Sequence, residues 1–150
     1  MDCIKKPAGK YTNYVLIIGK HIFLWVNLGN LIVMNIEEFR EYCLKKKGVQ
    51  ESFPFDLTTL VFKVMGKMFA LTDLEDRFSI NLKCDPLKAV ELRGEYNAVK
   101  PGYHMNKIHW NTIEMDGTID DDLLCQLIDD SYALVVQSLT KKDQQELNEL

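Results

Sequence analysis

The stretch that decides the fold is LVFKVMGKMFAL, residues 60–71. Apolar side chains recur at every second position on both sides of Gly66, which is the pattern of two antiparallel strands joined by a tight turn. After a second turn, Phe78, Ile80 and Leu82 alternate with polar neighbours in a third run. The stretch therefore predicts a three-strand antiparallel meander with one apolar and one polar face.

Helical patterns flank this meander on both sides. Apolar residues recur every three or four positions over residues 36–44, with Asn35 as the capping residue and Gly48 just past the end. Asp85 and Pro86 suit a cap and a first helical position, so they begin a second helix. The residues expected to bury that helix are Leu87, Val90, Leu92 and Tyr96.

The C-terminal third predicts further strands and two more helices. Residues 108–115 have the pattern of a strand, and a short strand within residues 102–106 is a weaker expectation. An apolar stripe predicts a long helix over about residues 120–139, with Asp129 and Asp130 facing solvent. A final helix is expected from Thr140, a capping residue, to the C-terminus.

The order of these elements favours an α+β fold. Alternating βαβ units are not evident, and the sequence contains neither a G-x-G-x-x-G fingerprint nor a Walker loop. Helices separated from antiparallel strands pack as a second layer. We therefore predict a two-layer sandwich, an antiparallel sheet with helices on one face, in the order α-β3-α-β2-α.

Length and charge restrict the classes of function. The 150 residues suffice for one domain with a core, and the formal net charge is −4. Residues 34–150 carry 14 Lys and Arg against 21 Asp and Glu, a formal charge of −7. A surface of that sign repels phosphate backbones unless it contains a local basic patch.

The first 33 residues differ from the rest of the chain. Residues 14–33 are apolar but interrupted by Lys20 and His21, and a lysine at the centre of a membrane helix costs about 3 kcal/mol. A membrane anchor, an added hairpin or helix, and an upstream extension are the open interpretations. We favour the extension, because the helix start at Asn35 opens a self-sufficient domain. The expected division is an N-terminal extension at residues 1–33 and a single domain at residues 34–150.

The cysteines favour a cytoplasmic location. Cys3, Cys43, Cys84 and Cys125 are far apart, without a C-x-x-C pair or a Cys/His cluster. Zinc-ribbon and disulfide-scaffold patterns both require closer spacing. Cys84 precedes a helix N-terminus, which can lower the pKa of a thiol, although an inert half-buried thiol is the favoured interpretation.

One polar segment, residues 103–112, gathers the residues best suited to binding. Lys107 suits a phosphate contact, with Tyr103 or Trp110 stacking on a base or sugar. A metal site or a general base is less well supported, because the two histidines are five residues apart and no partner nucleophile is evident. The competing interpretation places the aromatic residues in the core. The candidate residues of this segment are Tyr103, His104, Asn106, Lys107, His109 and Trp110.

Several ordered motifs together resemble the MmcQ/YjbR family over about residues 34–140. Their order and register make the resemblance specific. The matching motifs are NIEEFR at 35–40, FPF at 53–55, LVFKV at 60–64, GKMFAL at 66–71, INLKCDP at 80–86, PGYHMNK at 101–107 and HW at 109–110.

The resemblance implies a fold and a class of partner. Members of this family are similar in fold to the bacterial frataxin homologue and to type III secretion chaperones. They are commonly described as predicted DNA-binding proteins with a double-wing motif, and no catalytic residues, cofactor or metal are implied. DNA is then the expected partner, and the candidate phosphate contacts are Lys63, Lys67, Lys83 and Lys107.

The alternative is a non-enzymatic adaptor domain. It would take a small ligand or a protein partner on the open face of the sheet or on residues 103–111. This hypothesis predicts an apolar pocket or groove there, whereas DNA binding predicts lysines that converge on one face. An enzyme is the third hypothesis and ranks last, because the sequence supplies no coherent set of acid, base and nucleophile.

Overall fold

The computed structural model describes residues 15–17, 23–25 and 34–150, and the chain divides into two compact units, residues 1–32 and 33–150. In the first unit, strand β1 (Val15–Ile17) pairs antiparallel with β2 (Phe23–Trp25). The expectations of an extension at residues 1–33 and of an anchor at residues 14–33 otherwise lie outside the described residues. Within the described ranges, no helix is both long and apolar enough to cross a membrane.

The second unit is built on a six-stranded antiparallel sheet. Its strands follow the spatial order β3-β4-β5-β6-β8-β7, so only the last two depart from the order of the sequence. The strands are β3 (Val49–Ser52), β4 (Thr59–Val64), β5 (Lys67–Asp73), β6 (Ser79–Lys83), β7 (Val99–Pro101) and β8 (Trp110–Glu114).

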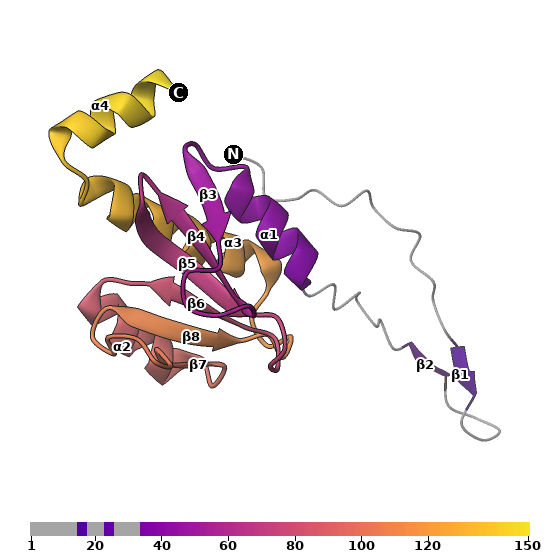
Figure 1. Cartoon of the computed structure of the whole chain (residues 1–150). Coiled ribbons are helices and arrows are strands. Elements are labelled where there is room, and N and C mark those ends of the chain that lie inside the picture. Colours follow the sequence, from indigo (N-terminus) through magenta and orange to yellow (C-terminus); the bar gives the residue numbers. More distant parts are fainter. Residues whose placement is uncertain (1–14, 18–22, 26–33) are drawn as a thin grey trace. The chain divides into compact units, whose positions relative to one another are not determined.

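The described residues 34–150 form four helices beside the sheet (Figure 1). Each helix begins at a side-chain cap. Asn35 and Glu38 form a reciprocal capping box at the start of the first helix, which satisfies amide groups that would otherwise lack partners. The helices are α1 (Ile36–Leu44), α2 (Pro86–Glu95), α3 (Asp121–Gln137) and α4 (Lys141–Glu149), with caps Asn35, Asp85, Asp120 and Thr140. The predicted capping residues and the predicted long helix over about residues 120–139 are therefore confirmed.

Helices α1, α2 and α3 cover one face of the sheet. The ring of Phe39 on α1 packs edge-to-face against Phe62 of β4, with ring centroids 5.4 Å apart. Arg93 of α2 donates to the Asn111 side chain of β8, which lies in the same cross-strand row as Phe62. Lys88 of α2 also pairs with α3. The α+β sandwich with helices on one face is therefore confirmed.

The core lies between this helical layer and the sheet. The largest side chains that are fully buried come from α1, from the central strands and from α3, so one core connects both layers. The apolar ones on this side of the sheet are Phe39, Phe62, Phe69, Ile80, Ile113, Leu124, Ile128, Val64 and Val135.

Ser131 of α3 is hydrogen-bonded into the sheet. A bulge interrupts the pairing of β4 with β5, and the pairing of β5 with β6 ends at Ala70 and Leu82. Just beyond that point, the Ser131 hydroxyl accepts from Lys83 N at 2.8 Å and donates to Phe69 O at 2.6 Å. One helix hydroxyl thus satisfies a backbone donor of β6 and a backbone acceptor of β5.

The strands differ from the prediction at both edges of the sheet. Strand β3 was not expected, because its sequence VQES lacks alternating apolar residues. The weak strand expected within residues 102–106 is wrong: the paired residues are Val99–Pro101, and the chain after Pro101 forms the loop to β8. The order in the domain is therefore α-β4-α-β2-α-α, with one strand more than predicted, and the last helix is the one expected from Thr140.

Two residues expected to bury α2 are exposed instead. Leu87 and Val90 are 79% and 65% exposed, while Ala89 and Leu92 face the core. The buried stripe is therefore shifted around the helix from the stripe that the larger side chains indicated.

Candidate functional site

The sheet face opposite the helices is not the fully wetted surface that the alternation of polar residues predicted. One cross-strand row on this face runs through Val61, Leu71, Asn81 and Thr112, four residues paired in register from β4 to β8. All four are buried, with exposed fractions between 0% and 8%. Some part of the chain other than the helices must therefore cover this row.

Three loops provide that cover. The β3–β4 loop contributes Phe55 and Asp56, and the β5–β6 loop contributes residues 76–78. These two loops adjoin, because Leu74 N donates to Thr58 O at 3.0 Å. The β7–β8 loop approaches from the far edge of the sheet with residues 103–105.

Between the loops and the sheet lies a cavity of about 580 Å³, which we call the loop-covered cavity. That volume falls within the range of small-molecule sites in proteins. Its lining combines aromatic and apolar side chains with hydroxyl, amide and charged groups. The lining residues are Phe55, Asp56, Thr59, Leu71, Asp73, Asp76, Arg77, Phe78, Ser79, Asn81, Lys100, Pro101, Tyr103, His104, Met105, Thr112 and Glu114.

A hydrogen-bonded chain forms part of the cavity floor. Tyr103 N donates to Thr112 Oγ1 at 2.8 Å, and the Thr112 hydroxyl donates to Asn81 Oδ1 at 2.5 Å. Asn81 is 7% exposed, and its Nδ2 group makes no hydrogen bond with any residue in the described part of the chain. A nearly buried amide in a cavity wall therefore retains two donor hydrogens.

Arg93 of α2 fixes the β7–β8 loop from behind. Its guanidinium donates to Lys107 O at 2.5 Å, to Trp110 O at 3.1 Å and to Asn111 Oδ1 at 2.7 Å. Within the loop, His104 has a φ of +54° and its ring lies against that of Tyr103, with centroids 4.1 Å apart. Because the Arg93 guanidinium donates to three acceptors in and next to this loop, it constrains the loop even though most of the loop residues are exposed.

Acidic groups outnumber basic ones around the cavity. Asp56, Asp73, Asp76 and Glu114 line it together with Arg77 and Lys100 as the only Lys or Arg. Hydrogen bonds from the backbone and side chain of Thr59, and from Thr58, hold the pKa of Asp56 below its usual value. The cavity therefore has a negative formal charge and does not favour a phosphate group.

The structure gathers only part of the predicted site. Tyr103 and His104 line the loop-covered cavity, and Tyr103 is 67% exposed rather than in the core. Trp110 is buried, while Asn106, Lys107 and His109 are exposed and do not line the cavity. Asn106 has a local role, since its side chain accepts from Ile108 N at 2.9 Å.

The four candidate lysines do not form one cluster. Lys63 and Lys83 alternate with buried residues of the helical face, so they lie on the open face, and Lys83 is paired with Trp110. Lys67 instead donates to Ser138 O at the C-terminal end of α3, at 2.7 Å. Lys107 lies in the loop held by Arg93.

Sequence reasoning missed Asn81, Thr112 and Glu114. Each occupies a polar position of an alternating strand, the place where a solvent-facing side chain is expected. The alternation of apolar and polar residues does not reveal that three loops fold over this face. Only the density of polar and aromatic residues after Pro101 pointed toward it.

The described residues give little support for a metal site or for a reactive thiol. No group of three or more His, Cys, Asp or Glu side chains within residues 15–17, 23–25 and 34–150 is placed to hold a metal ion. Burial raises the pKa of the Cys84 thiol and opposes the effect of the neighbouring helix N-terminus. The result agrees with the favoured interpretation of Cys84 as an inert thiol.

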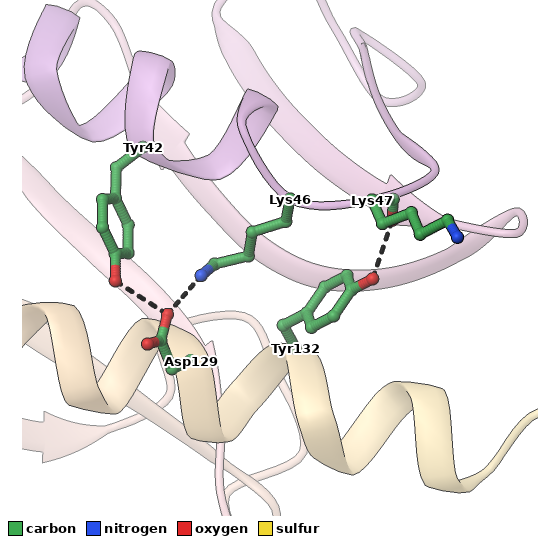
Figure 2. Close-up of polar contacts among 5 residues, drawn as sticks. All are labelled: Tyr42, Lys46, Lys47, Asp129 and Tyr132. Carbon is green, nitrogen blue, oxygen red and sulfur yellow. Dashed lines mark hydrogen bonds and ion pairs between the residues drawn. The ribbon is translucent and has the colours of Figure 1, made fainter. Parts of the chain in front are cut away.

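A second polar cluster joins α1 to α3 on the opposite side of the sheet (Figure 2). The ammonium of Lys46 pairs with Asp129, and Tyr42 OH donates to the same carboxylate at 2.9 Å. The Lys46 Nζ also lies 4.3 Å from the centre of the Tyr42 ring. Tyr132 OH donates to Lys47 O at 2.7 Å. Every polar group in this cluster has a partner within the fold, so we interpret it as structural.

Comparisons with known proteins agree with this architecture. The sequence model of the YjbR family matches residues 44–134. The chain is 34% identical to the uncharacterized protein YjbR of Escherichia coli K12 over 118 residues, which are 78% of this chain and 100% of that protein. It is 41% identical to the uncharacterized protein YbdF of Escherichia coli O157:H7 over 109 residues, which are 72% of this chain and 89% of that protein.

Solved structures show the same arrangement. A crystal structure of a Deinococcus radiodurans protein with a DUF419 domain is similar with a TM-score of 0.72 and 40% identity, over 77% of this chain and 89% of that one. A crystal structure of a Pseudomonas syringae protein is similar with a TM-score of 0.60 and 28% identity, over 67% of this chain and 98% of that one.

Proposed function

This chain belongs to the YjbR family, and from its geometry we propose that it binds a small organic ligand in the loop-covered cavity. The family match and the similarity to YjbR confirm the resemblance that the sequence motifs indicated. The relatives YjbR and YbdF are described as uncharacterized, so they assign no ligand or reaction.

The observation that carries the proposal is the nearly buried Asn81 amide at the wall of a cavity of about 580 Å³. The Asn81 Nδ2 group is not enclosed: it borders the cavity and can donate to a molecule bound there. A hydrogen bond from this group to an acceptor atom of a ligand contributes about 1 kcal/mol. Aromatic walls around a few directional polar groups are typical of a small-molecule site.

We propose binding rather than catalysis. His104 and His109 are both exposed, and neither side chain hydrogen-bonds a nucleophile within residues 34–150. The cavity holds carboxylates, but Asp56 and Asp73 accept hydrogen bonds that shape their own loops. A cytoplasmic location stays a prediction from the cysteine spacing.

DNA binding is the second candidate. Lys63 and Lys83 lie on the open face of the sheet, as that hypothesis requires. The engagement of Lys67 with Ser138 and the acidic lining of the cavity weigh against a continuous basic surface. We therefore rank DNA binding below small-ligand binding, with Lys83 and Lys107 as its most informative residues.

The test is a titration of the ¹⁵N-labelled full chain with 4-ethylphenol, followed by NMR. We expect shifts confined to residues around the cavity, including the Asn81 side-chain amide. Replacing Asn81 with leucine should weaken binding about five-fold, the equivalent of one hydrogen bond of about 1 kcal/mol. The matched Asn97→Leu variant, changed in an exposed turn after α2, should bind as the wild type does.

Shifts scattered over the surface, or equal affinities of the two variants, would contradict the proposal. A titration with double-stranded DNA at two salt concentrations gives the competing result. Salt-sensitive binding that Lys83→Ala and Lys107→Ala both weaken would favour the DNA hypothesis instead.

A further inference from the structure

We infer that the ligand of the loop-covered cavity is a small organic cation: an aromatic or apolar body that carries a protonated amine and at least one hydrogen-bond acceptor. This inference rests on the proposed function, because it names the class of ligand for the same cavity. It follows from which polar groups of the lining are already used by the fold and which are not.

Glu114 is the acid that the fold leaves available. Its carboxylate makes no hydrogen bond or ion pair with another residue of the range 34–150. By contrast, Asp56 accepts from Thr58 N and Thr59 N, and Asp73 Oδ1 accepts from Glu75 N and Asp76 N.

Strand register places Glu114 near a second carboxylate. Ser79 pairs with Glu114, and the pairing of β5 with β6 runs as far as Thr72 and Ile80, the residues next to Asp73 and Ser79. Asp73 and Glu114 thus lie two strands apart, about 10 Å between Cα atoms, and Ser79 lines the cavity with them. This row lies next to the row that carries Asn81 and Thr112, so its acidic groups and the amide donor border the same space.

The cations of the lining are more exposed than Glu114. Arg77 and Lys100 are exposed, whereas Glu114 is half-buried. Solvent and salt screen an exposed charge more effectively than a half-buried one. The inner part of the cavity therefore favours a positive group, although the rim carries charges of both signs.

The aromatic lining suits the same class of ligand. Phe55, Phe78 and Tyr103 come from three different loops and all border the cavity. Aromatic faces bind apolar ring systems and also attract a cationic group placed over them. Asn81 Nδ2 supplies donor hydrogens, which is why the ligand also needs an acceptor atom.

Three molecules with the same ring system test the inference: 5-methoxytryptamine, 5-methoxytryptophol and 5-methoxyindole-3-acetate. They end in an ammonium, a hydroxyl and a carboxylate, and each carries a methoxy oxygen as an acceptor. NMR titrations of the full-length chain should show the amine binding about five-fold more tightly than the alcohol, the upper end of what a partly exposed ion pair contributes. The carboxylate should bind most weakly.

Replacing Glu114 with glutamine should reduce the preference for the amine over the alcohol to within about two-fold. Glu91→Gln, at an exposed position of α2, is the matched control and should retain the preference. Unchanged amide resonances away from the cavity verify that each variant is folded.

The outcomes separate the two claims. If all three molecules bind in the cavity and the carboxylate binds as well as the amine, the inference is wrong and the proposed function stands. A preference for the amine that persists in Glu114→Gln also overturns the inference. If none of the three perturbs the resonances of Asn81, Tyr103 and Thr112, the proposed function and the inference both fail.

Discussion

At the scale of single residues, two consecutive aspartates of α3 have different surroundings. Helical periodicity predicted that Asp129 and Asp130 both face solvent. Asp130 pairs with Lys88 at 2.5 Å, and both side chains are more than 40% exposed. Asp129 instead accepts from Tyr42 and pairs with Lys46, whose side chain is only 8% exposed. The burial of the lysine, rather than that of the aspartate, decides how much each ion pair contributes to stability.

We predict that Asp129→Ala is more destabilising than Asp130→Ala. The first substitution leaves the nearly buried Lys46 ammonium without its carboxylate, and we expect a loss of about 1–2 kcal/mol after allowing for the partial exposure of Asp129. The second should cost about 0–1 kcal/mol, since Lys88 can be solvated. Urea unfolding of both variants measures the difference, and equal costs would contradict the structural role of the Lys46 pair.

At the scale of elements, the sequence predicted the centre of the fold better than its edges. Strands β4, β5 and β6 alternate in hydrophobicity because one face of each packs on helices. Among the described strands, edge strand β3 pairs with β4 alone, and β7 is three residues long and ends in Pro101, so neither carries a periodic signal. Capping residues were reliable because a cap acts through its immediate neighbours.

The attachment of α4 can be tested at Gly48, which has a φ of +67° after α1. A Cβ atom there would clash with Leu147 Cδ1 of α4, whereas one at Gly66, with a φ of +77°, would meet nothing within 4 Å. Each Gly→Ala change should cost about 1 kcal/mol for backbone strain. Gly48→Ala should cost more, because Leu147 must also move.

Thermal or urea unfolding of the two glycine variants checks this prediction. Adding Leu147→Ala to both backgrounds should abolish the difference between Gly48→Ala and Gly66→Ala. A difference that survives in the double variants would show that the contact with α4 is not its cause.

At the scale of the whole molecule, the site was less predictable than the fold. The segment after Pro101 drew attention correctly to Tyr103 and His104. Asn81 and Glu114 come from strands separated by more than thirty positions in the chain, and they border one cavity only because β6 pairs with β8. Single-sequence patterns describe faces of elements, whereas a cavity depends on how distant loops fold over them.

The same scale governs the response to alkaline pH. Burial is the main cause that raises the pKa of Tyr42, Cys43, Cys84 and Tyr132. In the unfolded chain the pKa of a thiol is about 8.5 and that of a tyrosine is about 10. The folded chain keeps these protons at higher pH, so their contribution to stability is complete below about pH 8.5 and is lost as the pH rises above it.

We therefore predict that the free energy of unfolding falls between pH 8 and pH 10. The buried Cys43 should account for up to about 2 kcal/mol of that fall. Urea unfolding of Cys43→Ala across the same pH range should give a flatter dependence than the wild type, and Cys84→Ala, at a half-buried position, should flatten it less. Equal slopes for the wild type and Cys43→Ala would contradict the assignment.

The hydroxyl of Ser131 has a consequence for how the sheet is held together. It bridges β5 and β6 where their backbones no longer pair, and so it connects strands β3-β4-β5 to strands β6-β8-β7. The cavity on the opposite face is lined by Leu71 from the first set of strands and by Asn81 and Thr112 from the second. A ligand bound there would contact both sets of strands, on the sheet face opposite the one that the Ser131 hydroxyl bridges.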